Sequence, residues 1–490
     1  MQFTSLYFAA FLIPVFALYW MLHKHGKTQN LIFLLASYTF YAYWNWRYLS
    51  LLFLISMFSY VSGLLIYRTR TPSMKRALLL SSIIVCITTL SYFKYFAFFI
   101  NTCADLLSQV NYTLPKPASS LLMPLGMSIY IFLSLSYIID VYHDKMPAER
   151  NAINVLLSLS FFPIIFSGPV QKPITLLPQV CNNRVFDPSL AREGLRQILW
   201  GLFMKTVIAD NCAVLANQIF DNYPSYSGST LLLGAVYYSI QVYSDFAGYS
   251  EIAIGVSKLF GFTLMRNFSN PYFSRDMTEF WRTWHISLTS WFREYIFLPM
   301  AYSISRHCPG EKVLFMKSEL LIYIIGISVT WLLTGLWHGG NYTFVVWGLM
   351  HGGILVLYRV LHKPRQKLFR RLNINNSGLP VRCVERAVTL WTIIVTWIVF
   401  RANDLGAAAG YLRRMLSPSL FSRPAVPSGA LPFLIIFFFM IEWIQKDKTC
   451  SMDIDCAVTS KPLRWSLYYG LIFMIVWFAG SRQQFIYFQF

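Results

Sequence analysis

Long apolar runs separated by short polar breaks recur along this chain, and they constrain its fold more than any other feature. The runs cover residues 6–22, 31–46, 49–67, 77–100, 121–140, 155–166, 230–262, 320–337, 342–360, 388–400, 431–443 and 465–480. A helix needs about 20 mostly apolar residues to cross the hydrocarbon core of a bilayer. Only 13% of the residues are charged, whereas about a quarter of an ordinary globular protein is charged. We therefore predict roughly ten to thirteen membrane segments.

The spacing of these runs predicts one continuous domain. The sequence contains no linker long enough to separate a second folded domain, no low-complexity segment and no repeat of fixed period. Backbone polar groups inside a bilayer must be paired within the protein, which favours helices. We predict an all-α, polytopic membrane bundle that forms a single embedded domain over residues 1–490.

Positive charge is in large excess, with a formal net charge of +20 at pH 7. In a soluble protein this would suggest nucleic-acid binding. Here the cations lie in breaks between apolar runs, such as 68–76 and 362–371. At such positions Lys and Arg set topology and contact anionic head groups. We expect membrane lipids and not nucleic acid as their partners, and we expect both breaks on the cytoplasmic side.

Common metal and cofactor motifs are absent from the sequence. The eight cysteines are scattered, without a C-x-x-C pair or a Cys/His cluster at metal-ligand spacing. The serine-hydrolase elbow, the zinc pair H-E-x-x-H, the P-loop and the dinucleotide fingerprint are also missing. We predict no metal and no bound cofactor. What remains is an embedded imidazole, which could deprotonate a hydroxyl or thiol.

Two acidic residues, Asp245 and Glu251, lie inside the apolar run 230–262. Charged groups at membrane depth are expensive and usually face the bundle interior or a water-filled cavity. Either the two carboxylates are satisfied by neighbouring groups or they belong to a site.

The stretch Asp276–Tyr295 is amphipathic. Its apolar side chains follow helical spacing on one face, and its charged side chains, with His285, lie on the other. This pattern is typical of a helix lying in the head groups, and equally of a helix lining a funnel. The pattern alone favours an interfacial role for His285.

His338 is followed directly by two glycines, between two apolar runs. Paired glycines weaken a helix and allow its backbone to break. Non-helical backbone is tolerated at membrane depth only where it is buried in protein or lines a cavity. We predict that the helix ends or breaks after His338 and that His338 borders a pocket. His351, also followed by two glycines, is better explained as structural.

Two motifs resemble the membrane-bound O-acyltransferase family. One is the stretch 273–289, which contains Trp-His-x-Ser-Leu at 284–288, and the other is Gly-Leu-Trp-His-Gly at 335–339. Shorter segments resemble the bacterial branch that includes the alginate O-acetyltransferase membrane subunit and its peptidoglycan and cellulose acetylating relatives. These segments are 166–170, 177–179, 245–250 and 399–402.

The resemblance implies re-entrant or broken helices around a central tunnel, with a catalytic region at about residues 240–360. It implies that His338 is the general base and that His285 is the second catalytic residue. If both serve one reaction, both rings must reach a common cavity, because a base acts only within hydrogen-bond reach of its proton. We expect four further residues to line the substrate tunnel: Asp245, Trp284, Trp337 and Asn341.

The resemblance also implies a reaction and its partners. An acyl group, in this branch acetyl, would pass from a cytoplasmic donor such as acetyl-CoA toward an extracytoplasmic polysaccharide. Alginate-like exopolysaccharide, cellulose and peptidoglycan are the candidate acceptors. A periplasmic acetyltransferase partner protein and a location in the bacterial inner membrane are implied as well.

Two other classes of function fit many of the same features. A polytopic transporter or flippase for a lipid-linked sugar also has broken helices and embedded charges, but it predicts inverted repeats, which the sequence does not show. An integral glycosyltransferase would use a carboxylate base, either Asp245 or Glu251.

Overall fold

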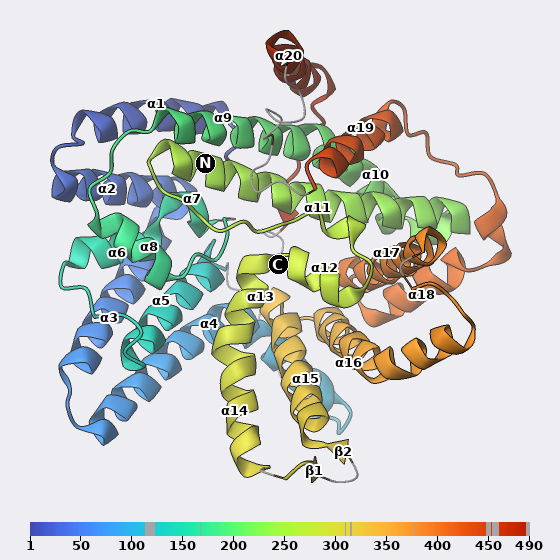
Figure 1. Cartoon of the computed structure of the whole chain (residues 1–490), viewed down its shortest axis with the longest axis horizontal. Coiled ribbons are helices and arrows are strands. Elements are labelled where there is room, and N and C mark those ends of the chain that lie inside the picture. Colours follow the sequence, from blue (N-terminus) through green and yellow to red (C-terminus); the bar gives the residue numbers. More distant parts are fainter. Residues whose placement is uncertain are drawn as a thin grey trace. The chain divides into compact units, whose positions relative to one another are not determined.

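The computed structural model describes residues 1–112, 123–166, 168–308, 310–313, 316–376, 378–446, 452 and 460–486 (Figure 1). Within these ranges the regular structure is helical, apart from one antiparallel hairpin of β1 (Lys312–Val313) and β2 (Met316–Lys317). The all-α prediction is confirmed. Residues 121 and 122 of the run predicted at 121–140, and Ser167 of the segment 166–170, lie outside the described residues.

The chain divides into two compact units. The first comprises Met1–Phe203, Gly248–Met265 and the described part of Lys448–Phe473. Its helices are α1 (Leu6–Met21), α2 (Gly26–Asn45), η1 (Trp46–Tyr48), α3 (Leu49–Arg68), α4 (Pro72–Ser108), α5 (Met127–Tyr142), α6 (Ala152–Ser160), α7 (Phe162–Ile165), α8 (Pro173–Cys181) and α9 (Pro188–Phe203).

The second unit comprises Met204–Ala247, Arg266–Asp447 and Met474–Phe490, as far as these ranges are described. Its elements are η2 (Met204–Ala209), α10 (Asp210–Asp221), η3 (Tyr223–Ser225), η4 (Pro271–Phe273), α12 (Met277–Thr283), α13 (Ile286–Phe292), η5 (Arg293–Phe297), α14 (Leu298–His307), the β hairpin, α15 (Ser318–His338), α16 (Tyr342–Arg371), α17 (Leu379–Arg401), α18 (Leu405–Met415), η6 (Pro418–Phe421) and α19 (Leu431–Ile444). Helices α11 (Gly228–Leu259) and α20 (Lys461–Phe478) contribute residues to both units. One domain over residues 1–490 stays a prediction.

Six helical stretches in the described part of the chain, two of which join several of these elements, are long and apolar enough to cross a membrane. They are Gly26–Arg68, Pro72–Ser108, Pro188–Asp221, Ser318–His338, Tyr342–Arg371 and Leu379–Arg401. Four further apolar helices are shorter, among them α1 and α19. The number of membrane segments stays a prediction, and some of the apolar runs fold as short helical pieces. The run 155–166, for example, is divided at Phe161 into α6 and α7.

Helices α15 and α16 pack against each other at a pair of glycines, Gly335 and Gly348 (Figure 1). A Cβ atom added to Gly335 would lie 2.4 Å from the carbonyl oxygen of Phe344, and one added to Gly348 would lie 2.3 Å from that of Trp331. Small residues allow membrane helices to approach backbone to backbone. This close crossing fixes the end of α15, where His338 lies.

Candidate active site

A cavity of about 270 Å³ lies among α12, α13, η5, α15 and α16 of the second unit. Apolar and aromatic side chains form most of its wall: Trp281, Leu288, Phe292, Phe297, Trp331 and Leu355. His285 and His338 both line it. The structure thus brings the two histidines to one cavity, as predicted for residues of one site, and their catalytic roles stay predictions.

His338 is the last residue of α15, and the predicted end of the helix at this point is confirmed. Gly339 continues in extended backbone, and a Cβ atom on it would lie 2.6 Å from the ring of Phe344. The side chain of Asn341 then caps α16 by accepting a hydrogen bond from the backbone N–H of Thr343 at 3.0 Å. The turn between the helices therefore depends on glycine for space and on asparagine for a new helix start.

Aromatic rings surround the imidazole of His338, whose residue is only 4% exposed. The ring centroids of Trp337, Trp347 and Phe400 lie 4.8, 4.9 and 5.0 Å from it, all with edge-on geometry. These rings come from α15, α16 and α17. Packing from three helices holds the imidazole in place at the cavity wall.

His285 lies at a break between two short helices, because the amphipathic stretch does not form one straight helix. Asp276 caps α12 by accepting from the N–H groups of Thr278 and Glu279, each at 2.8 Å. The helix ends at Thr283, and His285 adopts the left-handed conformation, φ 43° and ψ 51°. The stretch therefore turns His285 inward, where it is 3% exposed.

The neighbours of His285 are one polar side chain and several aromatic rings. Its Nδ1 lies 2.9 Å from Oδ1 of Asn267. Phe246 packs edge-on at 4.6 Å between ring centroids, and Trp337 lies at 6.0 Å. His285 lies outside the six candidate spans, and burial lowers its pKa to about 3, so the ring is neutral at pH 7. An interfacial role, which the pattern alone favoured, does not fit this burial.

The other predicted tunnel residues lie in different surroundings. Trp284 lines the cavity with the two histidines. Trp337 contacts both imidazoles. Asn341, besides capping α16, donates a hydrogen bond to the backbone oxygen of Asn403 at 2.9 Å.

Asp245 belongs to a buried ion cluster in the second unit. Lys205 lies 2.8 Å from Asp245 and 2.7 Å from Asp210, and all three side chains are nearly inaccessible. Asp245 also accepts the backbone N–H of Ile486 at 2.8 Å. Glu251, in the first unit, accepts from Gln197 at 2.9 Å. Both carboxylates are thus satisfied by neighbouring groups, which was one of the two expectations.

Asn267 is a site residue that sequence reasoning missed. It lies in the segment Arg266-Asn267-Phe268-Ser269-Asn270-Pro271, a polar stretch directly before the amphipathic region. The only local signal is this cluster of turn-forming residues after a long apolar run. Thr330 and Thr334, one turn apart on α15, also line the cavity and were not predicted.

A second and larger cavity, of about 960 Å³, shares part of its lining with the first. The shared residues are Thr278, Arg282, Tyr323 and Leu355. Charged side chains form much of the polar lining: the arginines Arg275, Arg282, Arg359 and Arg365, and the carboxylates Asp276, Glu279 and Glu385. Because the two cavities share wall residues, the larger, arginine-containing cavity adjoins the histidine cavity.

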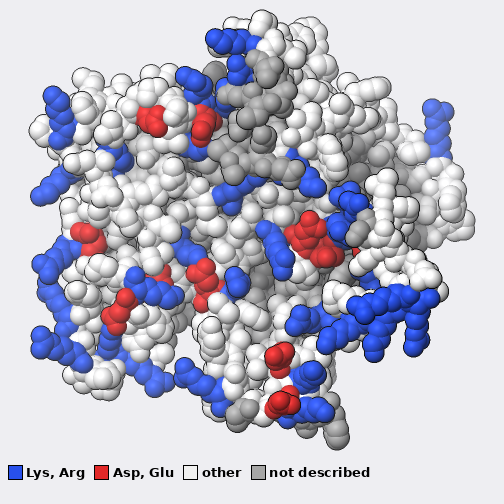
Figure 2. Space-filling model, in the orientation of Figure 1, with Lys and Arg blue, Asp and Glu red and all other residues white. Residues whose placement is uncertain are grey.

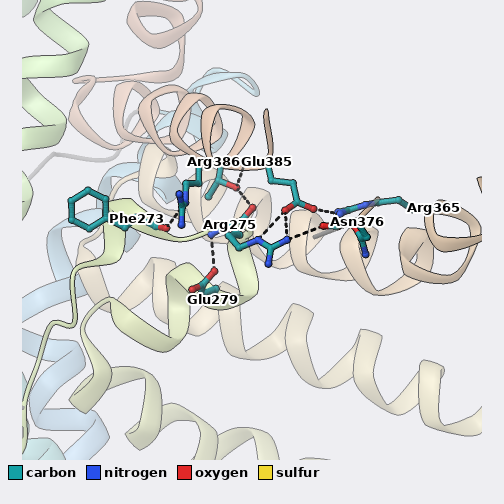
Figure 3. Close-up of polar contacts among 8 residues, drawn as sticks. Phe273, Arg275, Glu279, Arg365, Asn376, Glu385 and Arg386 are labelled. Carbon is teal, nitrogen blue, oxygen red and sulfur yellow. Dashed lines mark hydrogen bonds and ion pairs between the residues drawn. The ribbon is translucent and has the colours of Figure 1, made fainter. Parts of the chain in front are cut away.

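An ion network fixes two of these cations (Figure 3). Arg275 donates to Oε2 of Glu385 from Nε at 3.0 Å and from Nη2 at 2.8 Å, and Arg365 pairs with the other oxygen of the same carboxylate. The backbone N–H of Arg275 donates to Glu279 at 2.7 Å. The network ties the start of α12 to α16 and α17, and so holds the wall between the two cavities.

The fold defines a multi-pass membrane protein, and its second unit has two buried histidines at an apolar cavity. Residues 150–377 match the membrane-bound O-acyltransferase family. A protein of Pseudomonas syringae pv. tomato named "Probable alginate O-acetylase AlgI" is 34% identical over 479 residues, covering 94% of this chain and 87% of its own. The chain therefore belongs to the membrane-bound O-acyltransferase family and is a membrane-bound O-acyltransferase.

Two further relatives act on other polymers, according to their names. The "Peptidoglycan O-acetyltransferase" of Helicobacter pylori is 31% identical over 442 residues, covering 84% of this chain and 79% of its own. The "Teichoic acid D-alanyltransferase" of Bacillus subtilis is 26% identical over 286 residues, covering 57% of this chain and 67% of its own. The transporter and glycosyltransferase alternatives are not retained.

Proposed function

We propose that this enzyme transfers an acetyl group from cytoplasmic acetyl-CoA toward an extracytoplasmic polysaccharide, with His338 as the general base. The observation that supports this most is the shared cavity of His285 and His338 beside a larger cavity that four arginines line. One space has the apolar walls and imidazoles that acyl transfer needs. The other has the charges that a phosphorylated donor needs.

The chemical step follows from the position of His338. A neutral imidazole nitrogen takes the proton of the acceptor hydroxyl as its oxygen attacks the carbonyl carbon of the acetyl thioester. The new C–O bond forms and the C–S bond breaks. The leaving thiolate takes the proton back from the imidazolium. The products are an acetyl ester and free coenzyme A, and the histidine returns to its neutral form.

The donor would enter from the larger cavity, where four arginines are available. Coenzyme A carries several phosphate groups, and Arg side chains bind phosphate well. One face of α15 lines the histidine cavity from Tyr323 to His338, and at 1.5 Å per residue the helix rises about 22 Å between them. An extended pantetheine arm with its acetyl group could follow this face.

The direction of entry follows from charge. Lys and Arg side chains gather over the C-terminal end of α16, as Figure 2 shows, and two residues near this end, His362 and Arg365, line the larger cavity. The positive-inside rule places such a basic segment in the cytoplasm. His338 lies at the opposite end of α15 from Tyr323 and so would be nearer the outer face.

The acceptor side of the proposal is supported by the names of the relatives. Alginate, peptidoglycan and teichoic acid are all polymers of the bacterial envelope, and two of the three names specify acetyl transfer. We therefore propose an envelope polysaccharide as the final acceptor, a periplasmic acetyltransferase as partner, and the bacterial inner membrane as location.

A reconstituted assay tests this proposal. Purified protein in proteoliposomes receives acetyl-CoA together with an alginate, cellulose or peptidoglycan fragment, with and without a periplasmic extract. Free thiol and O-acetyl ester are measured. Thiol release coupled to ester formation on one polymer supports the proposal, and dependence on the extract supports the partner. Ester formation from an acyl carrier protein but not from acetyl-CoA would contradict the proposed donor.

A further inference from the structure

We propose that Asn267 is a positioning residue that holds His285 in the tautomer with its proton on Nδ1, so that Nε2 carries the lone pair. This inference rests on the proposed function, because it assigns His285 a defined state within that site. The evidence is the set of contacts made by one side-chain oxygen.

Three polar groups lie within hydrogen-bond distance of Oδ1 of Asn267. Nδ1 of His285 lies at 2.9 Å, the hydroxyl of Ser287 at 2.8 Å and the backbone nitrogen of Ser287 at 3.4 Å. Asn267 is fully buried. Water therefore does not compete for these contacts.

The backbone N–H of Ser287 shows which side-chain atom of Asn267, oxygen or nitrogen, lies next to it. A backbone N–H can only donate a hydrogen bond, so the side-chain atom of Asn267 at this point must be the amide oxygen and not the amide nitrogen. An amide oxygen can only accept. Nδ1 of His285 must then be the donor, and a neutral ring with its proton on Nδ1 has the lone pair on Nε2.

The backbone around this contact is held on both sides. The carbonyl oxygen of Asn267 accepts a hydrogen bond from the backbone N–H of Ile286 at 2.8 Å. The backbone N–H of Ser269 donates to the carbonyl oxygen of Thr283 at 2.9 Å. The loop that carries Asn267 is thus bonded to the residues before and after His285. The left-handed backbone of His285 is uncommon for a residue other than glycine, and surrounding contacts must maintain it.

A buried carboxylate anchors the same loop further along. Asn270, also left-handed with φ 51°, donates from Nδ2 to the carboxylate of Glu442 at 2.6 Å and to its backbone oxygen at 3.1 Å. The hydroxyl of Tyr243 donates to the same carboxylate. The loop is therefore fixed before substrate enters, and Asn267 is preorganised to orient the ring.

The groups around His285 make its protonation sensitive to Asn267. The rings of Phe246, Phe268 and Trp337 pack against it from α11, the loop and α15. The titratable or charged groups that share its cavity are His338 and Tyr323 on α15, Arg282 on α12 and Arg293 on η5. No carboxylate is among the described residues of that cavity. A carboxylate introduced at position 267 would therefore be the nearest anion to the ring.

Two variants distinguish a positioning role of Asn267 from a purely structural role. Asn267→Asp keeps the accepting oxygen and adds a charge that stabilises the imidazolium. We expect the acidic limb of the kcat/KM profile to move up by at least one pH unit, with activity restored to within about 3-fold of wild type at pH 9.

Asn267→Ala loses the acceptor, and we expect kcat to fall about 10- to 100-fold at every pH with little change in donor KM. Asn222→Asp, at the exposed residue that directly follows α10, controls for the added charge.

The contrary result is equal loss in both variants at every pH, with an unmoved acidic limb, in protein that elutes and melts like the wild type. That result would reduce Asn267 to a structural residue.

A second measurement does not depend on turnover or on the folding of the two Asn267 variants. The ¹⁵N spectrum of the wild-type protein with labelled histidine, assigned by comparison with His285→Asn, distinguishes protonated from unprotonated ring nitrogens. We expect a protonated Nδ1 and an unprotonated Nε2 for His285. The reverse assignment would overturn the inference. If the spectrum shows a protonated Nδ1 but acetyl-CoA is not consumed, the proposed donor is wrong and the assigned tautomer of His285 still holds.

Discussion

The indole ring of Trp337 lies 6.0 Å from the imidazole of His285 and 4.8 Å from that of His338, its neighbour in sequence. One aromatic ring therefore packs against both histidines of the cavity. Because Trp337 and His338 are the last residues of α15, any shift of this helix end would change the spacing of both imidazoles together.

Replacement of His285 should show whether its ring transfers a proton or orients another group. His285→Asn keeps an amide that can donate to Asn267, whereas His285→Ala removes the side chain. If the role is orientation, we expect His285→Asn to retain activity at least 10-fold above His285→Ala in an acetyl-CoA turnover assay. Equal and complete loss in both variants would argue for proton transfer by His285 itself.

Arg282 should affect the binding of the donor and not the acyl-transfer step, because it lines both cavities. We expect Arg282→Gln to raise KM for acetyl-CoA about 5- to 10-fold with little change in kcat. The same variant should leave KM unchanged for acetyl-pantetheine, which lacks the phosphates. Arg371→Gln, at the exposed end of α16, is the matched control. An equal KM increase for both donors would show that Arg282 does not contact the phosphates.

The glycine crossing of α15 and α16 should be intolerant of a single methyl group. In Gly335→Ala the new Cβ would lie 2.4 Å from a backbone oxygen of α16, so the helices must separate. Overpacking of this kind typically costs about 1–3 kcal/mol. We expect a lower melting temperature in detergent and reduced acyl transfer. Gly353→Ala on α16 has no atom within 4 Å of its Cβ and should behave like the wild type. Similar melting temperatures for the two variants would contradict the close crossing.

The buried cluster of Lys205, Asp210 and Asp245 should be sensitive to loss of its cation. Removing one partner of a buried ion pair typically costs about 3–5 kcal/mol, because it leaves an uncompensated charge. We expect Lys205→Met to lower the melting temperature strongly and Asp245→Asn, which keeps an acceptor for Ile486, to lower it less. Lys75→Met, in the exposed pair with Asp144, should change little. A normal melting temperature for Lys205→Met would show that the carboxylates are not held by this lysine.

Local features of the sequence predicted those parts of the site that local chemistry determines. The glycines after His338 end α15 because glycine weakens a helix wherever it stands, and the apolar runs predicted helices because a bilayer permits little else. Composition could not predict that some apolar runs, such as 155–166, fold as short buried helices.

Tertiary contacts determine the rest, and they leave little trace in the sequence. The pattern favoured an interfacial His285, yet it is buried by Phe246 and by Trp337, which come from distant parts of the chain. Asn267 contacts His285 across a turn that no periodicity predicts. The pairing of Asp245 with Lys205 likewise depends on how α11 packs against the π-helical turn η2.

The most direct test of the central claim is single-turnover acetyl transfer by His338→Ala. The purified variant and the wild type are mixed with labelled acetyl-CoA and acceptor, and ester formation is followed with time. His307→Ala, which changes an exposed histidine at the end of α14, is the matched control. Loss of a general base typically slows the step by about 10²- to 10⁴-fold. We predict such a loss for His338→Ala, with normal expression and membrane insertion and with a wild-type rate for His307→Ala. Ester formation by His338→Ala at the wild-type rate would contradict the account.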